Sequence, residues 1–130
     1  MSMQRSVGQQ NAETLAEIRR TASDFASSGA GTQWLHGLLQ SHGLSSREGV
    51  LVKLAVLPEQ GGNLYKGVWL SVAEQFWEFT VQVPYGSQSF AQAESFENIT
   101  HSVAVSAHMP GTGKSFGHLA QQVLREANDG

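Results

Sequence analysis

The chain has 130 residues, 40% hydrophobic and 15% charged, which suits one globular domain with its own core. Its eight basic and eleven acidic residues give a formal net charge of −3, which disfavours nucleic-acid binding because such binding needs many cationic contacts to phosphates. The absence of cysteine excludes disulfides, thiolate nucleophiles and cysteine-ligated metal centres. No secretory leader and no apolar run of membrane-spanning length is found, so we expect a cytoplasmic protein without membrane contact.

Two helices are expected at the start of the chain. Residues 1–10 are polar and unpatterned, so we expect a frayed or disordered terminus there and a single α+β domain over residues 11–130. From Ala12, apolar residues recur at three- and four-residue spacing, which predicts an amphipathic helix with Asn11 as its cap. A shorter helix is predicted from Thr32 to a C-capping glycine at position 43, with four buried residues: Trp34, Leu35, Leu38 and Leu39.

Four strands are expected next. Apolar and polar residues alternate over 50–57, and Pro58 ends the strand because it lacks a donor for the ladder. Residues 65–72 and 76–83 predict two further strands, joined by short turns. Residues 85–97 carry mixed polar and aromatic residues and are expected to form a long loop. Alternation resumes over 99–107, which predicts the fourth strand.

The chain is expected to close with a helix that has a clear apolar stripe, formed by Phe116, Leu119, Ala120, Val123 and Leu124. The connections between the first three strands are too short for parallel crossovers, so the sheet should be antiparallel. The expected fold class is α+β, an antiparallel four-stranded meander with two N-terminal helices and one C-terminal helix packed on the sheet.

The stretch before the closing helix, residues 110–115, is similar to the end of a phosphate-binding P-loop. The full motif needs a glycine where this chain has His108, and only a short segment follows, without room for a magnesium-binding acid. The favoured interpretation is a sharp turn in which Ser115 caps the helix and Lys114 is solvated. A site at the helix start for an anion, formed by Gly111, Gly113, Lys114 and Ser115, stays open as an alternative.

No catalytic or metal-binding set is evident, and we expect neither an enzyme nor a cofactor. The histidines lack the spacing of known zinc motifs, and no serine lies in a nucleophile elbow. His101 is expected in the fourth strand as a hydrogen-bonded structural residue. The acids Glu74 and Glu78 should face water, where a carboxylate lacks the raised pKa that acid catalysis needs.

Aromatic residues beside acids are typical of protein-binding patches. On this ground Trp69, Glu74, Phe76 and Glu78 are the candidate partner-binding residues. Packing of Trp69 in the core is the favoured interpretation for that residue. Phe76 alternates onto the polar face of its strand, so we expect it on an exposed recognition surface.

The layout resembles that of small, acidic, cysteine-free immunity proteins, which bacteria encode beside polymorphic toxins. The resemblance rests on size, charge, the α+β order, the strand at residues 76–79 and the glycine loop at 111–117. It implies a cytosolic bacterial protein that neutralises a cognate toxin domain by covering its active site, with acidic residues facing basic groups. Two alternatives remain, a small-ligand or anion-binding domain and a secretion-associated chaperone or adaptor.

Overall fold

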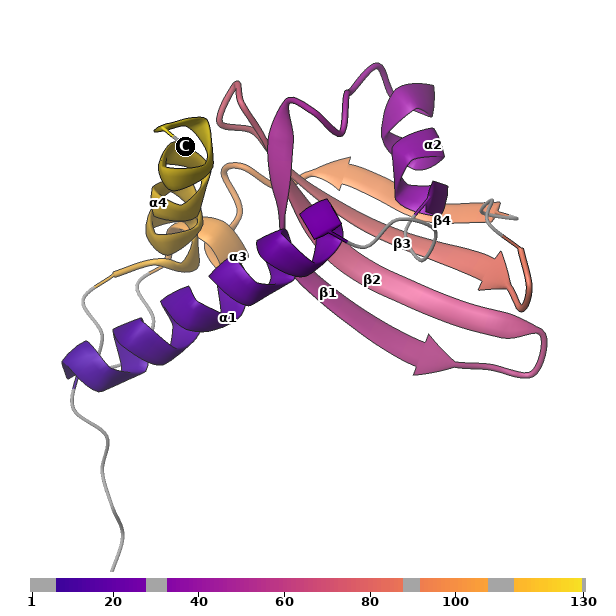
Figure 1. The fold of residues 1–130 in the computed structure, drawn as a ribbon, viewed down its shortest axis with the longest axis horizontal. Helices are drawn as coiled ribbons and strands as arrows, with labels where there is room; N and C mark the ends of the chain where they lie inside the picture. Colours follow the sequence, from indigo (N-terminus) through magenta and orange to yellow (C-terminus); the bar gives the residue numbers. More distant parts are fainter. Residues whose placement is uncertain (1–6, 28–32, 88–91, 108–113, 130) are drawn as a thin grey trace, which may run out of the picture.

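The computed structural model of the chain describes residues 7–27, 33–87, 92–107 and 114–129. Within them the chain forms an antiparallel sheet with helices before and after it, which confirms the α+β class (Figure 1). The elements in chain order are α1 (Val7–Ser27), α2 (Gln33–Ser41), β1 (Gly49–Pro58), β2 (Gly62–Ser71), β3 (Phe76–Pro84), β4 (Gln92–Asn98), α3 (Val103–Ser106) and α4 (Phe116–Asp129).

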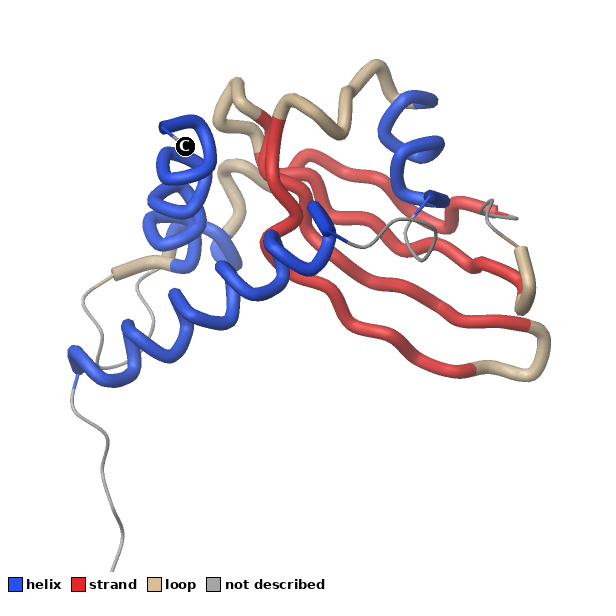
Figure 2. The backbone as a smooth tube through the Cα atoms, viewed as in Figure 1, coloured by secondary structure: helices blue, strands red, loops and turns tan. Residues whose placement is uncertain are grey.

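The sheet is a meander in the order β1-β2-β3-β4, and every neighbouring pair is antiparallel. A bulge between Leu51 and Lys53 shifts the register of β1 against β2, and a second, with its extra residue in β4 between Ala93 and Ser95, shifts the register of β4 against β3. Figure 2 shows α1 and α4 gathered toward one end of the strands and α2 apart from them, so that the hairpin end of the sheet extends past α1 and α4.

The two faces of the sheet carry separate cores. On one, the α2 face, Trp69 and Phe79 pack under α2 together with Leu38. On the other, the α4 face, Phe76 and Leu70 pack with residues of α1, α3 and α4. An antiparallel sheet covered on both faces buries apolar residues at successive positions, which explains the continuous apolar run of β2, from Val68 to Leu70.

Two glycines are required by their surroundings. Gly43 has a φ of 75°, the left-handed conformation of a helix C-cap, and confirms the predicted end of α2. Gly67 lies where a Cβ atom would approach the Phe79 ring to 2.6 Å. Because Gly67 has no side chain, the Phe79 ring can pack directly against the backbone of β2.

The prediction for the end of the sheet is wrong. The fourth strand is residues 92–98, inside the expected loop 85–97, and residues 99–107 form a turn and the four-residue helix α3. The ladder stops just past Asn98, where the amide of Ile99 donates to the Phe76 carbonyl oxygen at 2.8 Å. The Phe76 amide donates to the Thr100 hydroxyl at 2.9 Å, so a side chain replaces the next backbone partner and the chain turns away.

The first helix is longer than expected. It begins at Val7, so residues 7–10, expected to be frayed, belong to the helix, and Asn11 lies within α1 instead of capping it. Residues 1–6 lie outside the described part of the chain. Among the described helices, none has the length and apolar character needed to cross a membrane.

Candidate functional site

The glycine stretch before α4 is described only at its end. Gly111 and Gly113 lie outside the described residues, so the anion site predicted there stays a prediction. Lys114 is exposed. The hydroxyl of Ser115 accepts a hydrogen bond from the His118 amide at 3.1 Å, which confirms that Ser115 caps the helix.

The four candidate partner-binding residues divide into two buried aromatics and two exposed acids. Phe76 is fully buried at 0% exposure, so the expectation that it belongs to an exposed surface is wrong. Trp69 is also at 0% and belongs to the α2-face core, where a partner cannot contact its side chain. Glu74, in the β2–β3 turn with a φ of 62°, and Glu78, in β3, are both exposed.

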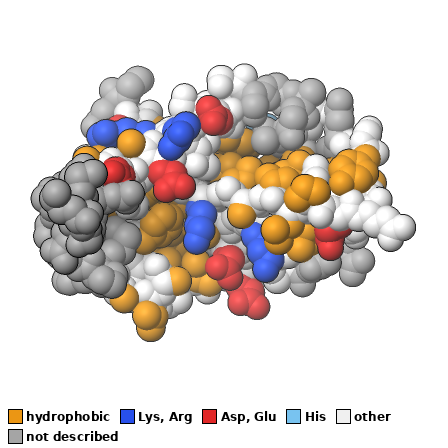
Figure 3. Space-filling view, turned by 90° about the horizontal axis from the view of Figure 1, so that it is seen from below, with side chains coloured by type: hydrophobic (Ala, Val, Ile, Leu, Met, Phe, Trp, Pro, Cys, Tyr) orange, Lys and Arg blue, Asp and Glu red, His pale blue; other side chains and the backbone are white. Residues whose placement is uncertain are grey.

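Within the described part of the chain, helices cover the α4 face of the sheet at one end only. Beyond Val68, toward the β1–β2 turn, the described side chains on this face are exposed or half-buried. Several of them line a shallow hollow of about 270 Å³. Figure 3 shows basic, acidic and hydrophobic side chains next to one another on the side of the molecule seen from below. We call this surface the open sheet face; by strand register it consists of Lys53, Ala55, Leu57, Leu64, Lys66, Glu78, Thr80, Gln82, Ser95 and Glu97.

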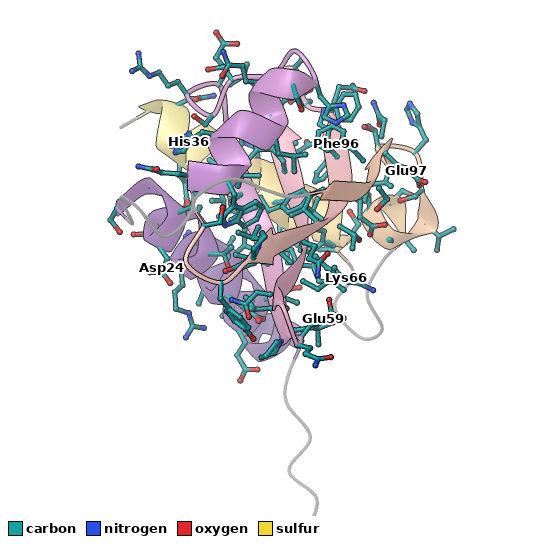
Figure 4. The ribbon with its side chains drawn as sticks, turned by 90° about the vertical axis from the view of Figure 1, so that its right-hand side faces the viewer. Asp24, His36, Glu59, Lys66, Phe96 and Glu97 are labelled. Atoms are coloured by element: carbon teal, nitrogen blue, oxygen red, sulfur yellow. The ribbon has the colours of Figure 1, made fainter. Side chains whose placement is uncertain are left out.

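Charges on the open sheet face are separated by sign. Its two lysines, Lys53 and Lys66, come from β1 and β2, whereas Glu78 and Glu97 come from β3 and β4. Glu78 and Glu97 are direct cross-strand partners, both exposed, and neither forms an ion pair or a side-chain hydrogen bond within the described residues. Figure 4 shows Lys66 and Glu97 on one side of the molecule and His36 on the other.

A cavity lies at the other end of the fold. It has a volume of about 820 Å³ and opens between the C-terminal ends of α1 and α4, the exposed side of α2 and the start of β1. Its polar lining includes His36, Ser46, Arg47 and Glu126, and Phe25 supplies an aromatic wall. We call it the helix-junction cavity.

His36 is positioned by two contacts. Its Nδ1 is hydrogen-bonded to the hydroxyl of Ser46, and its ring lies 5.3 Å from the Phe25 ring, centroid to centroid. No carboxylate of the described residues is bonded to the other ring nitrogen, so the pair lacks the third, orienting group of a hydrolase triad.

The remaining described histidines do not form a metal centre, and no group of three potential metal ligands occurs in the described ranges. His101 is exposed in the turn after β4, so its expected structural place in a strand is wrong. His42 stacks on Phe96 with ring centroids 3.8 Å apart and planes 7° apart. Phe96 in turn stacks on Trp77.

One bidentate ion pair joins the first and last helices beside the helix-junction cavity. The guanidinium of Arg19 donates to both oxygens of Glu126, at 2.9 and 2.6 Å. These hydrogen bonds, helped by the Coulomb attraction and opposed by burial, hold the pKa of the Glu126 carboxyl below its usual value and raise the pKa of Arg19. Both groups therefore stay charged over the neutral pH range.

Comparisons with known proteins found no match to a protein-family model, to a curated protein or to a solved structure. Of the candidate surfaces, sequence reasoning found only Glu78. Glu97 was missed because the sequence predicts a loop over residues 85–97, and Arg47 because a single exposed arginine in a turn carries no pattern. The weak alternation of residues 92–98, with one large apolar residue, Phe96, was the available signal for β4.

Proposed function

We propose that this chain is a protein-binding domain that acts as an immunity protein, neutralising a cognate toxin by laying the open sheet face over the toxin's active site. The observation that carries the proposal is the unpaired couple Glu78 and Glu97 on an exposed part of the sheet. The mechanism is steric and electrostatic occlusion and involves no chemical step on the part of this chain.

Electrostatic repulsion between Glu78 and Glu97 favours the binding of a basic group from a partner. Like charges directly opposite each other on neighbouring strands destabilise a sheet by a few tenths of a kcal/mol up to about 1 kcal/mol. No cation of the described residues neutralises Glu78 or Glu97. A basic group placed between them would remove the repulsion and gain a charge-assisted contact.

The rest of the open sheet face defines what the partner presents. The apolar side chain of Leu57 is 49% exposed at the edge of the face, so a partner can bury it on binding. Lys53 and Lys66 favour acidic or carbonyl groups on the partner at the β1 side, while the acids favour basic groups at the β4 side. Toxins that act on nucleic acid carry such basic groups around their active sites, because their substrate is a polyanion.

The two alternatives fare differently. A chaperone that captures an extended segment by strand addition needs a regular open edge. Here β1 carries a bulge after Leu51 and ends at Pro58, two features that blunt an edge strand. A small-ligand site has specific support in the helix-junction cavity, which lies apart from the open sheet face.

The test is complex formation with the protein encoded next to this chain's gene. Both proteins are purified separately and titrated calorimetrically, with the wild-type chain and with the double variant Glu78→Lys, Glu97→Lys. We expect a one-to-one complex that is weakened about tenfold or more by the double charge reversal, because repulsion replaces attraction at the contact. The neighbour's toxic activity should be inhibited in proportion to occupancy.

Glu59→Lys is the matched control. Glu59 is exposed in the β1–β2 turn, outside the open sheet face, and its reversal alters net charge by half as much without touching the proposed contact. Equal weakening by the control, after allowance for that charge difference, would contradict the proposal. So would a neighbour that forms no complex with the wild-type chain.

A further inference from the structure

The helix-junction cavity has the size and the lining of a small-molecule site, independently of the open sheet face. Its volume of about 820 Å³ lies within the range of about 300 to 1,000 Å³ typical of ligand pockets. Figure 1 shows the three contributing helices converging on the start of β1, so the cavity sits where separate elements meet. Junctions of this kind are common places for ligand sites.

One wall of the cavity carries hydrogen-bond donors for an anion. Arg47 is among the lining residues, and its side chain forms no ion pair with any described residue. His36 lines the same cavity, and its bond to Ser46 uses Nδ1, which leaves Nε2 without a partner among the described residues. Arginine with a second directed polar group is a typical recognition set for carboxylate.

The floor of the cavity is aromatic. The Phe25 ring lies edge-on to Trp69, with ring centroids 5.6 Å apart and planes at 83°. Gly49 lines the cavity directly above the same indole, since a Cβ at position 49 would lie 2.8 Å from its Nε1. That indole N–H is fully buried and has no hydrogen-bond partner within the described part of the chain. A flat apolar body fits this floor.

The one carboxylate of the lining does not oppose an anion. Glu126 lines the cavity, but both of its oxygens are engaged by Arg19. The ion pair cancels most of its field inside the cavity. The net electrostatic character on the Arg47 side is therefore positive.

We propose that the helix-junction cavity binds a small carboxylate with a flat apolar body. The carboxylate contacts the Arg47 guanidinium and the His36 ring, and the apolar body lies against Phe25 and over Gly49. An inorganic anion satisfies the first contact but not the second. An uncharged analogue satisfies the second but not the first.

The test uses phenylacetate as the probe, titrated into the isotope-labelled full-length chain and followed by the backbone and indole N–H signals in NMR spectra. We expect saturable shifts at Gly49, Arg47 and the Trp69 indole, with binding at concentrations up to about 10 mM, as expected for a ligand of about ten heavy atoms. Phenylacetamide and inorganic phosphate should each bind about tenfold or more weakly, because each loses one of the two contacts.

The matched variants are Arg47→Ala and Arg125→Ala, two exposed arginines of which only the first lines the cavity. Arg47→Ala should weaken phenylacetate about tenfold or more while its spectrum away from the cavity stays that of the wild type, and Arg125→Ala should leave the affinity unchanged. Three results would overturn the proposal: no saturable shift at the cavity, equal binding of phenylacetamide, or phosphate binding as tightly as phenylacetate.

Discussion

Glu78 and Glu97 face each other across β3 and β4, and the repulsion between them should also lower the stability of the free protein. Replacing Glu78 with Gln removes one of two like charges, so we expect the free energy of unfolding to rise by about 0.2 to 1 kcal/mol. Urea denaturation of the wild type and the variant at neutral pH and low salt measures the difference. If Glu78→Gln stabilises the fold and also weakens the complex, Glu78 contributes to binding at a cost in stability.

Glu59→Gln is the control, because Glu59 has no opposing acid in the register. It should change stability by less than about 0.5 kcal/mol, as surface substitutions usually do. If Glu78→Gln destabilises the chain, the repulsion inferred for the couple does not exist.

His42 and Phe96 form the tightest ring stack of the described residues, linking the end of α2 to β4. His42→Ala should lower the unfolding free energy by about 0.5 to 1.5 kcal/mol, because such pairs contribute that much beyond area burial. Thermal or urea unfolding measures the loss. Gln40→Ala, at an exposed position of α2, should change stability little, and an equal loss in both variants would assign the effect to the helix instead of the stack.

The burial of Phe76 shows what alternation can and cannot predict. The strand register does place Phe76 on the same face as Glu78, as the sequence pattern indicated. The environment changes along that face, however, because helices α1, α3 and α4 cover only the end near Phe76. A period of two distinguishes the faces of a strand but not how far along a face the covering helices extend.

At the scale of elements, α3 is held by a single buried residue. Val105 is 5% exposed and contacts α4 where Gly117 leaves room, since a Cβ there would lie 2.6 Å from its Cγ1 atom. Val105→Ala should destabilise the fold by about 1 to 3 kcal/mol through lost burial and the resulting cavity.

Val103→Ala is the matched control in the same short helix, because Val103 is 77% exposed. It should change the unfolding free energy by less than about 0.5 kcal/mol. A similar small effect of both substitutions would contradict the docking of α3 on α4 through Val105.

The ion pair between α1 and α4 makes stability depend on pH in a defined direction. Hydrogen bonds from Arg19 lower the pKa of Glu126 in the folded chain, so the native state binds this proton less readily than the unfolded chain does. The pair therefore stabilises the fold above the unfolded pKa, about 4.3, and this contribution is lost as pH falls through the lower folded value.

We expect Glu126→Gln to be less stable than the wild type at neutral pH, with a difference that shrinks as the solution is acidified below about pH 4. Urea unfolding at a series of pH values measures it. Glu17→Gln, at an exposed position of α1 that lacks a side-chain ion pair, is the control and should give a small difference at every pH. A wild-type advantage that persists undiminished at acid pH would contradict this assignment.

The sequence predicted the elements with strong periodicity and missed those without it. The bounds of β1, β2 and β3 lie within three residues of those predicted, and α4 contains the whole predicted stripe, because each of these elements buries several large apolar residues. Edge strand β4 lies in a polar segment and contains one large apolar residue, Phe96, so it carries almost no pattern. Residues 99–107 alternate, but they begin with a turn that the pattern does not encode. The Phe76 amide donates to the Thr100 hydroxyl there, and the Thr100 amide donates to the Asn98 side-chain oxygen.

For the whole molecule, the meander and its antiparallel order follow from the short connections, and both were predictable. The two candidate sites were not, since each is assembled from segments far apart in sequence. The open sheet face depends on where the helices end over the sheet, and the helix-junction cavity depends on how three helices converge. Such properties arise from packing between elements and leave no local signal.

The central claim is that the open sheet face is the surface that meets the partner, and lysine footprinting tests it most directly. The chain has three lysines: Lys53 and Lys66 on that face, and Lys114 at the start of α4. Acetylation rates are measured by mass spectrometry for the free chain and for its complex with the neighbouring gene product. We predict that complex formation slows Lys53 and Lys66 by about tenfold or more, as expected for amines buried at an interface, and leaves Lys114 unchanged. A complex that protects Lys114 and leaves Lys53 and Lys66 as reactive as in the free chain would contradict the account.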